Sequence, residues 1–188
     1  MNAISPLPIA ARPYSIGTEA FREAMRHLAG GVSVITAGIG EDRTGLTATS
    51  PTSLSADPPT VLACVNREAS AIPVIASYRH FALNVLGEAQ RHVAENFTGK
   101  GGLRGPQRYR DAEWSTLETS ASVLDGALVA LDCELDEMIE RHSHTILIGR
   151  VVAARVAPGS QALIYWRGAY DRLAEKAAPP LTAGLVPY

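Results

Sequence analysis

Short segments rich in apolar and β-branched residues recur along this chain, and most are joined by short links. Two turn-forming pairs, Asp125-Gly126 and Pro158-Gly159, lie among the later segments. Neighbouring strands with short links pair antiparallel, so the sequence predicts a mainly β fold, an antiparallel barrel with a few peripheral helices. The expected strands span residues 32–37, 44–49, 60–66, 80–86, 128–137, 145–156 and 162–166.

The expected strands carry two further hints about the core. Residues 32–37 and 44–49 are separated by a glycine-rich segment and predict a hairpin. Residues 60–66 are almost continuously apolar, which favours a strand buried on both faces. Cys64 and Cys133 lie inside apolar runs, outside any CxxC motif, and we expect buried free thiols in a reducing compartment.

An N-terminal helix is predicted from Thr18, a suitable N-cap, to the glycine pair at residues 30–31. Phe21, Met25 and Leu28 fall on one side of this helix. Apolar residues at helical spacing most often face a core, and we interpret the three side chains in that way.

Two further helices and a long connection follow. Ser70 is the expected N-cap of a short helix with Pro73 in its first turn. Residues 88–97 predict another helix, with Val93 and Phe97 directed inward. Residues 98–121 form a glycine- and arginine-rich connection, and a loop of this length in a compact domain is typical of a lid or a binding segment. Its aromatic residues, Tyr109 and Trp114, indicate that it packs at least in part.

Length and composition indicate one ordinary globular domain. The chain has 188 residues, 46% of them hydrophobic and 19% charged. We divide it into an extended N-terminal arm (1–17), the domain (18–173) and a C-terminal tail (174–188). The formal net charge of −2 gives no electrostatic reason to expect nucleic acid or a membrane surface as a partner. The sequence shows neither a signal peptide nor an apolar run near the ~20 residues of a membrane span, which favours a cytoplasmic protein.

Residues 45–59, GLTATSPTSLSADPP, carry six hydroxyl side chains between two strand-like runs. A segment of this kind offers many short-range hydrogen-bond donors without a net charge, which suits a flat polar ring or a phosphate. The alternative is a solvated loop whose hydroxyls only cap turns.

A candidate anion site follows directly. Asn66 and Arg67 end an expected strand, and Ser70 begins a helix three residues later. A guanidinium, an amide, a hydroxyl and free helix N–H groups would then meet at one place. The alternative is that Ser70 only caps the helix and Arg67 is only solvated.

Other catalytic and binding motifs are weak or missing. Arg43 stands where a dinucleotide fingerprint requires its third glycine, and neither HExxH nor GxSxG occurs. His142 and His144, with Glu140 nearby, are a weak metal-binding signal because no further ligand stands at a standard spacing. We therefore predict no metal site.

Taken together, the segments resemble the flavin reductase-like domain family. The matching segments run in the family's order from about residue 21 to residue 173, and the SxSxDPP-type element and the later HTIxIG-type element are fairly specific. They read AGGVSVITA, GLTATSPTSLSADPPTVLACVNREAS, HFALNVL, LDCEL, HSHTILIGRV and LIYWRGAY.

The resemblance implies a homodimeric Greek-key split β-barrel of the FMN-binding type, acting as an NAD(P)H:flavin oxidoreductase. Such a flavin reductase uses NADH or NADPH as hydride donor to reduce FMN or FAD, often for a separate monooxygenase component. A chain of this size would also need a second subunit as a wall for its ligand groove.

The family pattern also assigns roles to residues of this chain. His144 matches a histidine associated with nicotinamide binding and hydride transfer, and Tyr170 matches an aromatic that closes over the site. The remaining matches would contact the flavin ring (Thr47, Ala48, Thr49, Ser50, Ser53 and Ser55), its phosphate (Asn66, Arg67 and Ser70) and its side chain (Ala82, Asn84 and Leu86).

Two positions depart from the family pattern. Pro51 stands where the family often has an aromatic or small residue, and His142-Ser143 replaces the usual Gly-Asp before the histidine. The alternatives to a reductase are a non-catalytic flavin-binding or electron-carrier protein on the same barrel, and an oxygenase-type enzyme that keeps its flavin. The sequence does not choose between FMN and FAD or between NADH and NADPH, and it names no partner oxygenase.

Overall fold

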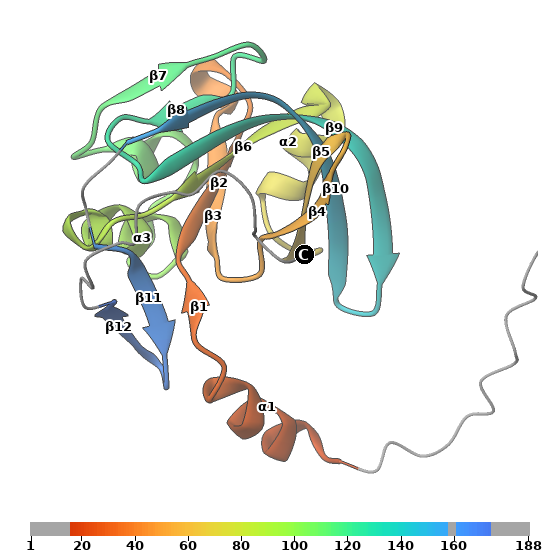
Figure 1. Ribbon diagram of the computed structural model, residues 1–188, viewed down its shortest axis with the longest axis vertical. Coiled ribbons are helices and arrows are strands. Elements are labelled where there is room, and N and C mark those ends of the chain that lie inside the picture. Colours follow the sequence, from red (N-terminus) through yellow and green to blue (C-terminus); the bar gives the residue numbers. More distant parts are fainter. Residues whose placement is uncertain (1–15, 158–160, 174–188) are drawn as a thin grey trace, which may run out of the picture.

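The computed structural model describes residues 16–157 and 161–173 (Figure 1). Residues 1–15 of the expected arm and the whole expected tail lie outside this range. The α-helices are α1 (Thr18–Arg26), α2 (Ala71–Tyr78) and α3 (Arg91–Phe97), and the 3-10 helices are η1 (Gly40–Asp42), η2 (Glu88–Gln90) and η3 (Gly105–Tyr109). Among the described residues, no helix has the length and apolar character needed to cross a membrane.

In the described ranges, twelve strands form three antiparallel sheets. They are β1 (Gly30–Gly31), β2 (Ser33–Ala37), β3 (Thr44–Ala48), β4 (Thr52–Ala56), β5 (Pro59–Asn66), β6 (His80–Val85), β7 (Trp114–Thr116), β8 (Ser122–Leu124), β9 (Val129–Arg141), β10 (His144–Val156), β11 (Leu163–Trp166) and β12 (Ala169–Arg172). The largest sheet has the order β3-β2-β6-β9-β10-β5-β4, and two small sheets, β1-β11-β12 and β7-β8, flank it. The predicted mainly β class and its hairpin of β2 with β3 are confirmed.

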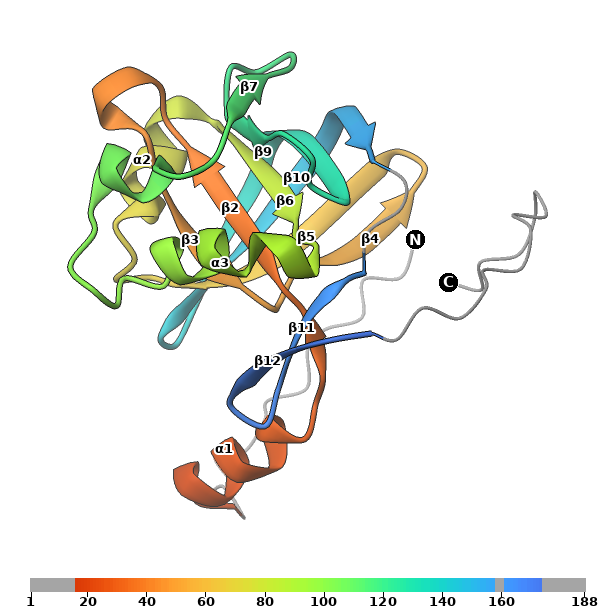
Figure 2. The same ribbon diagram turned by 90° about the vertical axis from the view of Figure 1, so that its left-hand side faces the viewer.

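The large sheet is forced to curl because its two edge strands are consecutive in the chain. In a flat sheet of seven strands the outer strands would lie about 29 Å apart. Only residues 49–51 join β3 to β4, and three linking residues span at most about 14 Å. The sheet therefore closes into a barrel (Figure 2), and since β3 and β4 do not pair with each other, the barrel is split between them.

Burial on both faces belongs to β2 and not to β5. All five residues of β2 are buried, with Ile35 packed inside the barrel and Val34 packed on the outer side that faces α3. In β5 burial alternates, so Val65 is buried whereas Cys64 is exposed. The prediction that residues 60–66 are buried on both faces was wrong, and so was the expectation that Cys64 is a buried thiol. Cys133 is buried as expected, and burial raises the pKa of its thiol to about 12.

A second hydrophobic cluster lies between the barrel and its outer cover. Val93 and Phe97 of α3 are buried here, as predicted. Tyr109 makes T-shaped contacts with Phe97 and with Trp114, and the Phe97 and Trp114 rings are tilted to each other, with ring centroids 4.8–5.6 Å apart. The Tyr109 hydroxyl donates a hydrogen bond of 2.6 Å to the Thr44 carbonyl oxygen. The long connection at residues 98–121 is therefore anchored to the start of β3, and its predicted aromatic packing is confirmed.

Helix α1 departs from the prediction. None of its residues is buried, and the exposed fractions are 54% for Phe21 and 45% for Met25, with 66% for Leu28 just beyond the helix. Figure 1 shows α1 extending away from the barrel below β1, and Arg26 at its end exchanges hydrogen bonds with Arg167 in the β11–β12 turn. The apolar stripe is present as predicted, but it does not face the core of its own chain.

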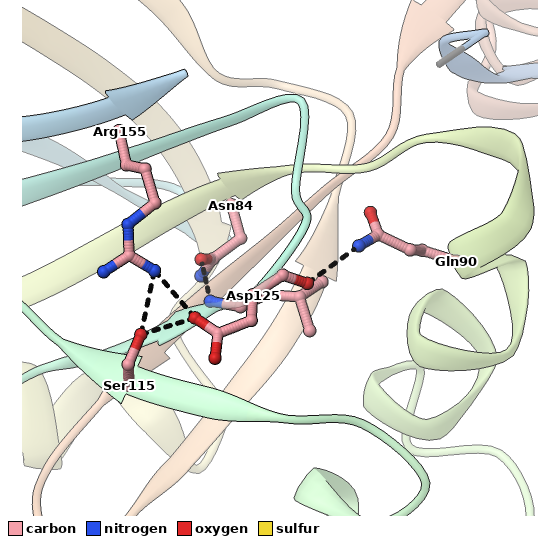
Figure 3. Close-up of polar contacts among 6 residues, drawn as sticks. Asn84, Gln90, Ser115, Asp125 and Arg155 are labelled. Atoms are coloured by element: carbon pink, nitrogen blue, oxygen red, sulfur yellow. Dashed lines mark hydrogen bonds and ion pairs between the residues drawn. The ribbon is translucent and has the colours of Figure 1, made fainter. Parts of the chain in front are cut away.

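A buried asparagine joins two strands of the barrel wall to β8. The Asn84 side chain has no exposed surface. Its Nδ2 donates a hydrogen bond of 3.2 Å to the Val34 carbonyl oxygen, and its Oδ1 accepts a hydrogen bond of 2.7 Å from the Leu124 N–H. The adjacent Asp125 is held from outside by Ser115 and Arg155, at 2.5 Å and 2.7 Å (Figure 3). The turn after β8 is thus fixed from both sides.

Asn84→Ala is expected to lower the free energy of unfolding by about 2–4 kcal/mol, because it leaves the buried Leu124 N–H without a partner and adds a small cavity. Urea denaturation followed by circular dichroism measures the change. Asn96→Ala is the matched control, since Asn96 makes one exposed hydrogen bond of 3.3 Å to the Arg110 carbonyl oxygen. A loss below about 1 kcal/mol for Asn84→Ala would contradict this role.

Candidate functional site

A cavity of about 800 Å³ opens where the end of β3 meets α3 and the β11–β12 hairpin. We call it the β3–α3 cavity; Figure 2 shows these elements next to one another. Its lining residues are Val32, Thr47, Ala48, Thr49, Arg91, Glu95, Thr98, Lys100, Gly101, Tyr165, Gly168, Ala169 and Tyr170. Residues far apart in the sequence therefore form one concave surface of ligand size.

The end of β3 is held rigidly against both of its neighbours. Ala48 pairs with Ser33 of β2, and the Thr47 hydroxyl donates a hydrogen bond of 2.6 Å to the Ala94 carbonyl oxygen on α3. Thr49 follows the strand and is exposed. The cavity floor is thus formed by a strand end whose position is fixed by the sheet and by α3.

An aromatic pair and an arginine form the opposite wall. Tyr165 and Tyr170 are directly opposed in β11 and β12, with ring centroids 5.4 Å apart in a T-shaped arrangement. The Arg91 guanidinium lies 5.4 Å from the centroid of the Tyr170 ring. Burial raises the pKa of Tyr170, and the nearby Glu95 and Tyr165 add to the rise. Tyr170 is therefore a neutral phenol at physiological pH and presents an aromatic surface to the cavity.

A second, smaller cavity lies at the end of β5. It has a volume of about 350 Å³, and we call it the hairpin cavity because the β9–β10 turn forms one side. The Arg67 backbone N–H donates a hydrogen bond of 3.1 Å to the Ser143 carbonyl oxygen, and this bond joins the end of β5 to the turn. The Asn66 Oδ1 atom accepts 2.9 Å from the Glu68 N–H. The lining residues are Asn66, Arg67, Glu68, His142 and Ser143.

His144 lies beside the hairpin cavity, at the first position of β10 and paired with Asn66 across the sheet. Its Nδ1 atom is 2.9 Å from the Ser143 hydroxyl oxygen. The sequence departure at residues 142–143 thus replaces a carboxylate with a hydroxyl that still contacts the imidazole. This contact fixes one side of the ring and leaves Nε2 without a hydrogen-bond partner in the described part of the chain.

Ser50, which follows Thr49 in the chain, is bonded to β5. Its hydroxyl donates a hydrogen bond of 2.8 Å to the Cys64 carbonyl oxygen and accepts one of 3.1 Å from the Cys64 N–H. Cys64 precedes Asn66 by two residues, about 7 Å of extended strand. Thr49 of the β3–α3 cavity is therefore one residue from a side chain anchored close to the hairpin cavity. Pro51 follows at the bend where the chain leaves β3 and enters β4.

The other expected hydroxyls do not line either cavity. Ser53 is exposed on β4, and Ser55 bonds locally to the Asp57 backbone at 2.9 Å and 3.1 Å. Ser70 precedes α2 as predicted, with Pro73 in the first turn, but its hydroxyl makes no capping bond and lies 3.3 Å from the Thr44 hydroxyl. For Ser55 the structure favours the turn-capping alternative.

Ala82, Asn84 and Leu86 are fully buried. The polar groups of the Asn84 side chain are hydrogen-bonded to the Val34 and Leu124 backbone. The Leu86 backbone is hydrogen-bonded to the backbone of Val32 and Leu163. These three side chains have no surface with which to line a ligand, and we correct the expected role to one in the core. The reason is the position of β6, which lies inside the sheet between β2 and β9.

Sequence reasoning missed every charged side chain of the β3–α3 cavity and one of its two tyrosines, namely Arg91, Glu95, Lys100 and Tyr165. The spacing of Arg91 and Glu95 predicts an ion pair on a helix, and the structure has one at 2.9 Å. Nothing in the sequence indicates that α3 packs beside β3. In the described ranges no three His, Cys, Asp or Glu side chains form a group suited to a metal ion.

The arrangement suits a ligand that combines planar rings with anionic groups. Aromatic and backbone surfaces line the β3–α3 cavity, and arginines border both cavities. Nη1 of the Arg67 guanidinium donates a hydrogen bond of 3.4 Å to the His142 carbonyl oxygen. This bond directs the guanidinium along the hairpin cavity. Guanidinium groups bind phosphates through paired N–H donors.

Comparisons with known proteins identify the family. The family model described as "Flavin reductase like domain" matches residues 25–174. The chain is 38% identical over 157 residues to FMN reductase (NADH) RutF 2 of Methylorubrum extorquens, which covers 84% of this chain and 90% of that protein.

Two solved structures are similar throughout their fold. One is BorF, the flavin reductase component of a bacterial two-component tryptophan halogenase, with a TM-score of 0.78, 30% identity, and coverage of 85% of this chain and 100% of that one. The other is the NADH:FAD oxidoreductase SgcE6 of Streptomyces globisporus in complex with NAD and FAD fragments, with a TM-score of 0.77, 29% identity, and coverage of 85% and 94%.

Proposed function

The chain belongs to the flavin reductase like domain family, and on this basis we propose that it is an NADH-dependent flavin reductase with FMN as its flavin. The observation that carries the proposal is the meeting of residues 47–49 with Tyr170 in the β3–α3 cavity. These are residues that the family pattern places against flavin, and more than 100 positions of sequence separate them. FAD and NADPH are the competing substrates in the experiment below.

The residues present fit a flavin nucleotide. The rigid end of β3 offers backbone groups and hydroxyls to the edge of a planar ring, and the Tyr165–Tyr170 pair offers an aromatic wall. Arg67 and Asn66 at the hairpin cavity supply donors for a phosphate. The Ser50–Cys64 bonds keep these two regions close, as a ligand with a ring at one end and a phosphate at the other requires.

The two nucleotides supply the redox chemistry, a hydride transfer from nicotinamide C4 to flavin N5. The protein provides orientation and exclusion of water. Arg67 holds the flavin phosphate, and the fixed end of β3 positions the ring. His144, steadied by Ser143 at Nδ1, presents Nε2 to orient the nicotinamide or to stabilise charge.

The reduced flavin is proposed to leave for a separate flavin-dependent monooxygenase or related oxygenase component. BorF, which shares the fold over its whole length, is a component of such a two-component system. In the proposed role, the exposed positions of Asn66, Arg67 and His144 allow the flavin to exchange with solvent.

The proposal includes a homodimer. The apolar stripe of α1 has no partner in the described ranges of its own chain, and apolar residues gathered on one exposed helix are typical of a protein interface. A second copy of the chain is the simplest cover, since most oligomers are symmetric homodimers.

Purified protein mixed aerobically with NADH and free FMN should oxidise NADH catalytically, as measured by loss of absorbance at the nicotinamide band. NADPH and FAD, tested in separate mixtures, should give lower kcat/KM values. Binding of flavin without any NADH oxidation would instead support the electron-carrier alternative.

Arg67→Ala should weaken FMN binding about tenfold or more and leave riboflavin binding almost unchanged, because riboflavin lacks the phosphate. Fluorescence titration with both ligands measures the two affinities. His144→Ala is the matched control from the same region, and it should leave FMN affinity nearly unchanged while raising the KM for NADH or slowing hydride transfer. Equal losses of FMN and riboflavin affinity in Arg67→Ala would reject the phosphate site.

Sedimentation velocity should give the mass of two chains for the parent protein. Phe21→Glu places a charge within the α1 stripe and should shift the protein to single chains. Ile39→Glu is the control, because Ile39 is similarly exposed (48%, against 54% for Phe21) and lies in the turn after β2. A dimer that persists in Phe21→Glu would show that α1 is not its interface.

A further inference from the structure

Arg91 is a cation that its own chain holds in place but uses only in part. Its Nε atom donates 2.9 Å to the Glu95 carboxylate, and its guanidinium lies 5.4 Å from the centroid of the Tyr170 ring. Within the described ranges its two terminal nitrogens have no hydrogen-bond partner. The guanidinium is therefore pre-oriented at the edge of the β3–α3 cavity, with its paired terminal N–H donors available to an anion.

Lys100 brings a second cation to the same cavity. Its backbone N–H donates 3.2 Å to the Thr98 hydroxyl, and the neighbouring Gly99 and Gly101 have φ values of 75° and 82°. These left-handed conformations suit glycine. Arg91 and Lys100 outnumber Glu95, which is the only carboxylate among the lining residues of the cavity.

This cationic position is separate from the one at Arg67. The β3–α3 cavity and the hairpin cavity share no lining residue. FMN has a single phosphate group, which cannot occupy both positions at once. If Arg67 holds that phosphate, the cations at Arg91 and Lys100 are left for the second nucleotide of the reaction.

We propose that Arg91 and Lys100 bind the diphosphate of the nicotinamide dinucleotide, which makes them specificity-determining residues for the hydride donor. A diphosphate carries two adjacent anionic groups, which matches a guanidinium fork with an ammonium beside it. The Tyr165–Tyr170 pair, proposed above as a wall for the flavin ring, borders the same cavity, so the two nucleotides would meet there. The inference rests on the proposed reductase function and extends it by separating the donor site from the flavin phosphate site.

Arg91→Gln and Lys100→Gln should each raise the KM for NADH. For Arg91→Gln we expect a rise of about tenfold, because the loss of one charge-assisted hydrogen bond has this effect on affinity. The rate with N-benzyl-1,4-dihydronicotinamide, an uncharged hydride donor without phosphate, should change less than about twofold, as should the KM for FMN. Arg110→Gln is the matched control. Arg110 and Arg91 have equally exposed side chains (59%), each in an ion pair with a carboxylate, but Arg110 does not line the cavity.

A binding measurement makes the test independent of turnover. Isothermal titration with ADP-ribose, which carries the diphosphate without the nicotinamide, should show binding to the parent and to Arg110→Gln. Binding to Arg91→Gln should be about tenfold weaker. Thermal unfolding should be nearly the same for all three proteins, because exposed ion pairs contribute little to stability.

The outcomes separate this inference from the reductase proposal. An equal loss of rate with NADH and with the uncharged donor would overturn the diphosphate assignment, and so would a rise in the KM for FMN alone. A parent that binds ADP-ribose through Arg91 but reduces no flavin would overturn the reductase function and retain the diphosphate site. ADP-ribose affinity unchanged in Arg91→Gln would reject the site whatever the turnover.

Discussion

The structure depends on a short covalent link between the two edges of its main sheet. Three residues join β3 to β4, although these strands stand at opposite ends of a seven-stranded order. This constraint curls the sheet, and the paired bonds of the Ser50 hydroxyl to the Cys64 backbone hold the link against β5. The same link carries Thr49 from the β3–α3 cavity toward the end of β5. The link that closes the barrel therefore also carries part of the candidate site.

A second layer outside the barrel converts the closed sheet into a site. Because β2 is buried on both faces, the chain needs an outer cover, which α3 and the connection after it provide. The aromatic cluster of Phe97, Tyr109 and Trp114 anchors that cover to the start of β3. Arg91, Glu95 and Lys100 are carried on the same cover and so reach the cavity. Packing that is needed for stability thus also delivers the charged groups.

The cationic side chains that could bind anionic groups of the two nucleotides lie at two separate places. Arg67 lies at the end of β5, whereas Arg91 and Lys100 border a different cavity. A reductase must bring together two nucleotides, each with its own anionic groups. Two separate cationic positions, with residues 47–49 lining one of the two cavities, would satisfy that requirement within one small domain.

The sequence by itself determined seven of the twelve described strands, the hairpin of β2 with β3, the helix after Ser70 and the inward positions of Val93 and Phe97, because these follow from local periodicity and turn chemistry. It did not indicate β1, β4, β7, β8 or β12. It also supplied a family pattern whose residues 47–49 and Tyr170 lie in one cavity. Only the tertiary structure decided which strand is buried on both faces, which is β2 and not β5 as expected. It likewise placed Asn84 in the barrel wall, left the stripe of α1 exposed and brought Arg91 beside β3. The physical reason is that periodicity records which face of an element is apolar, whereas the partner of that face is set by contacts between distant segments.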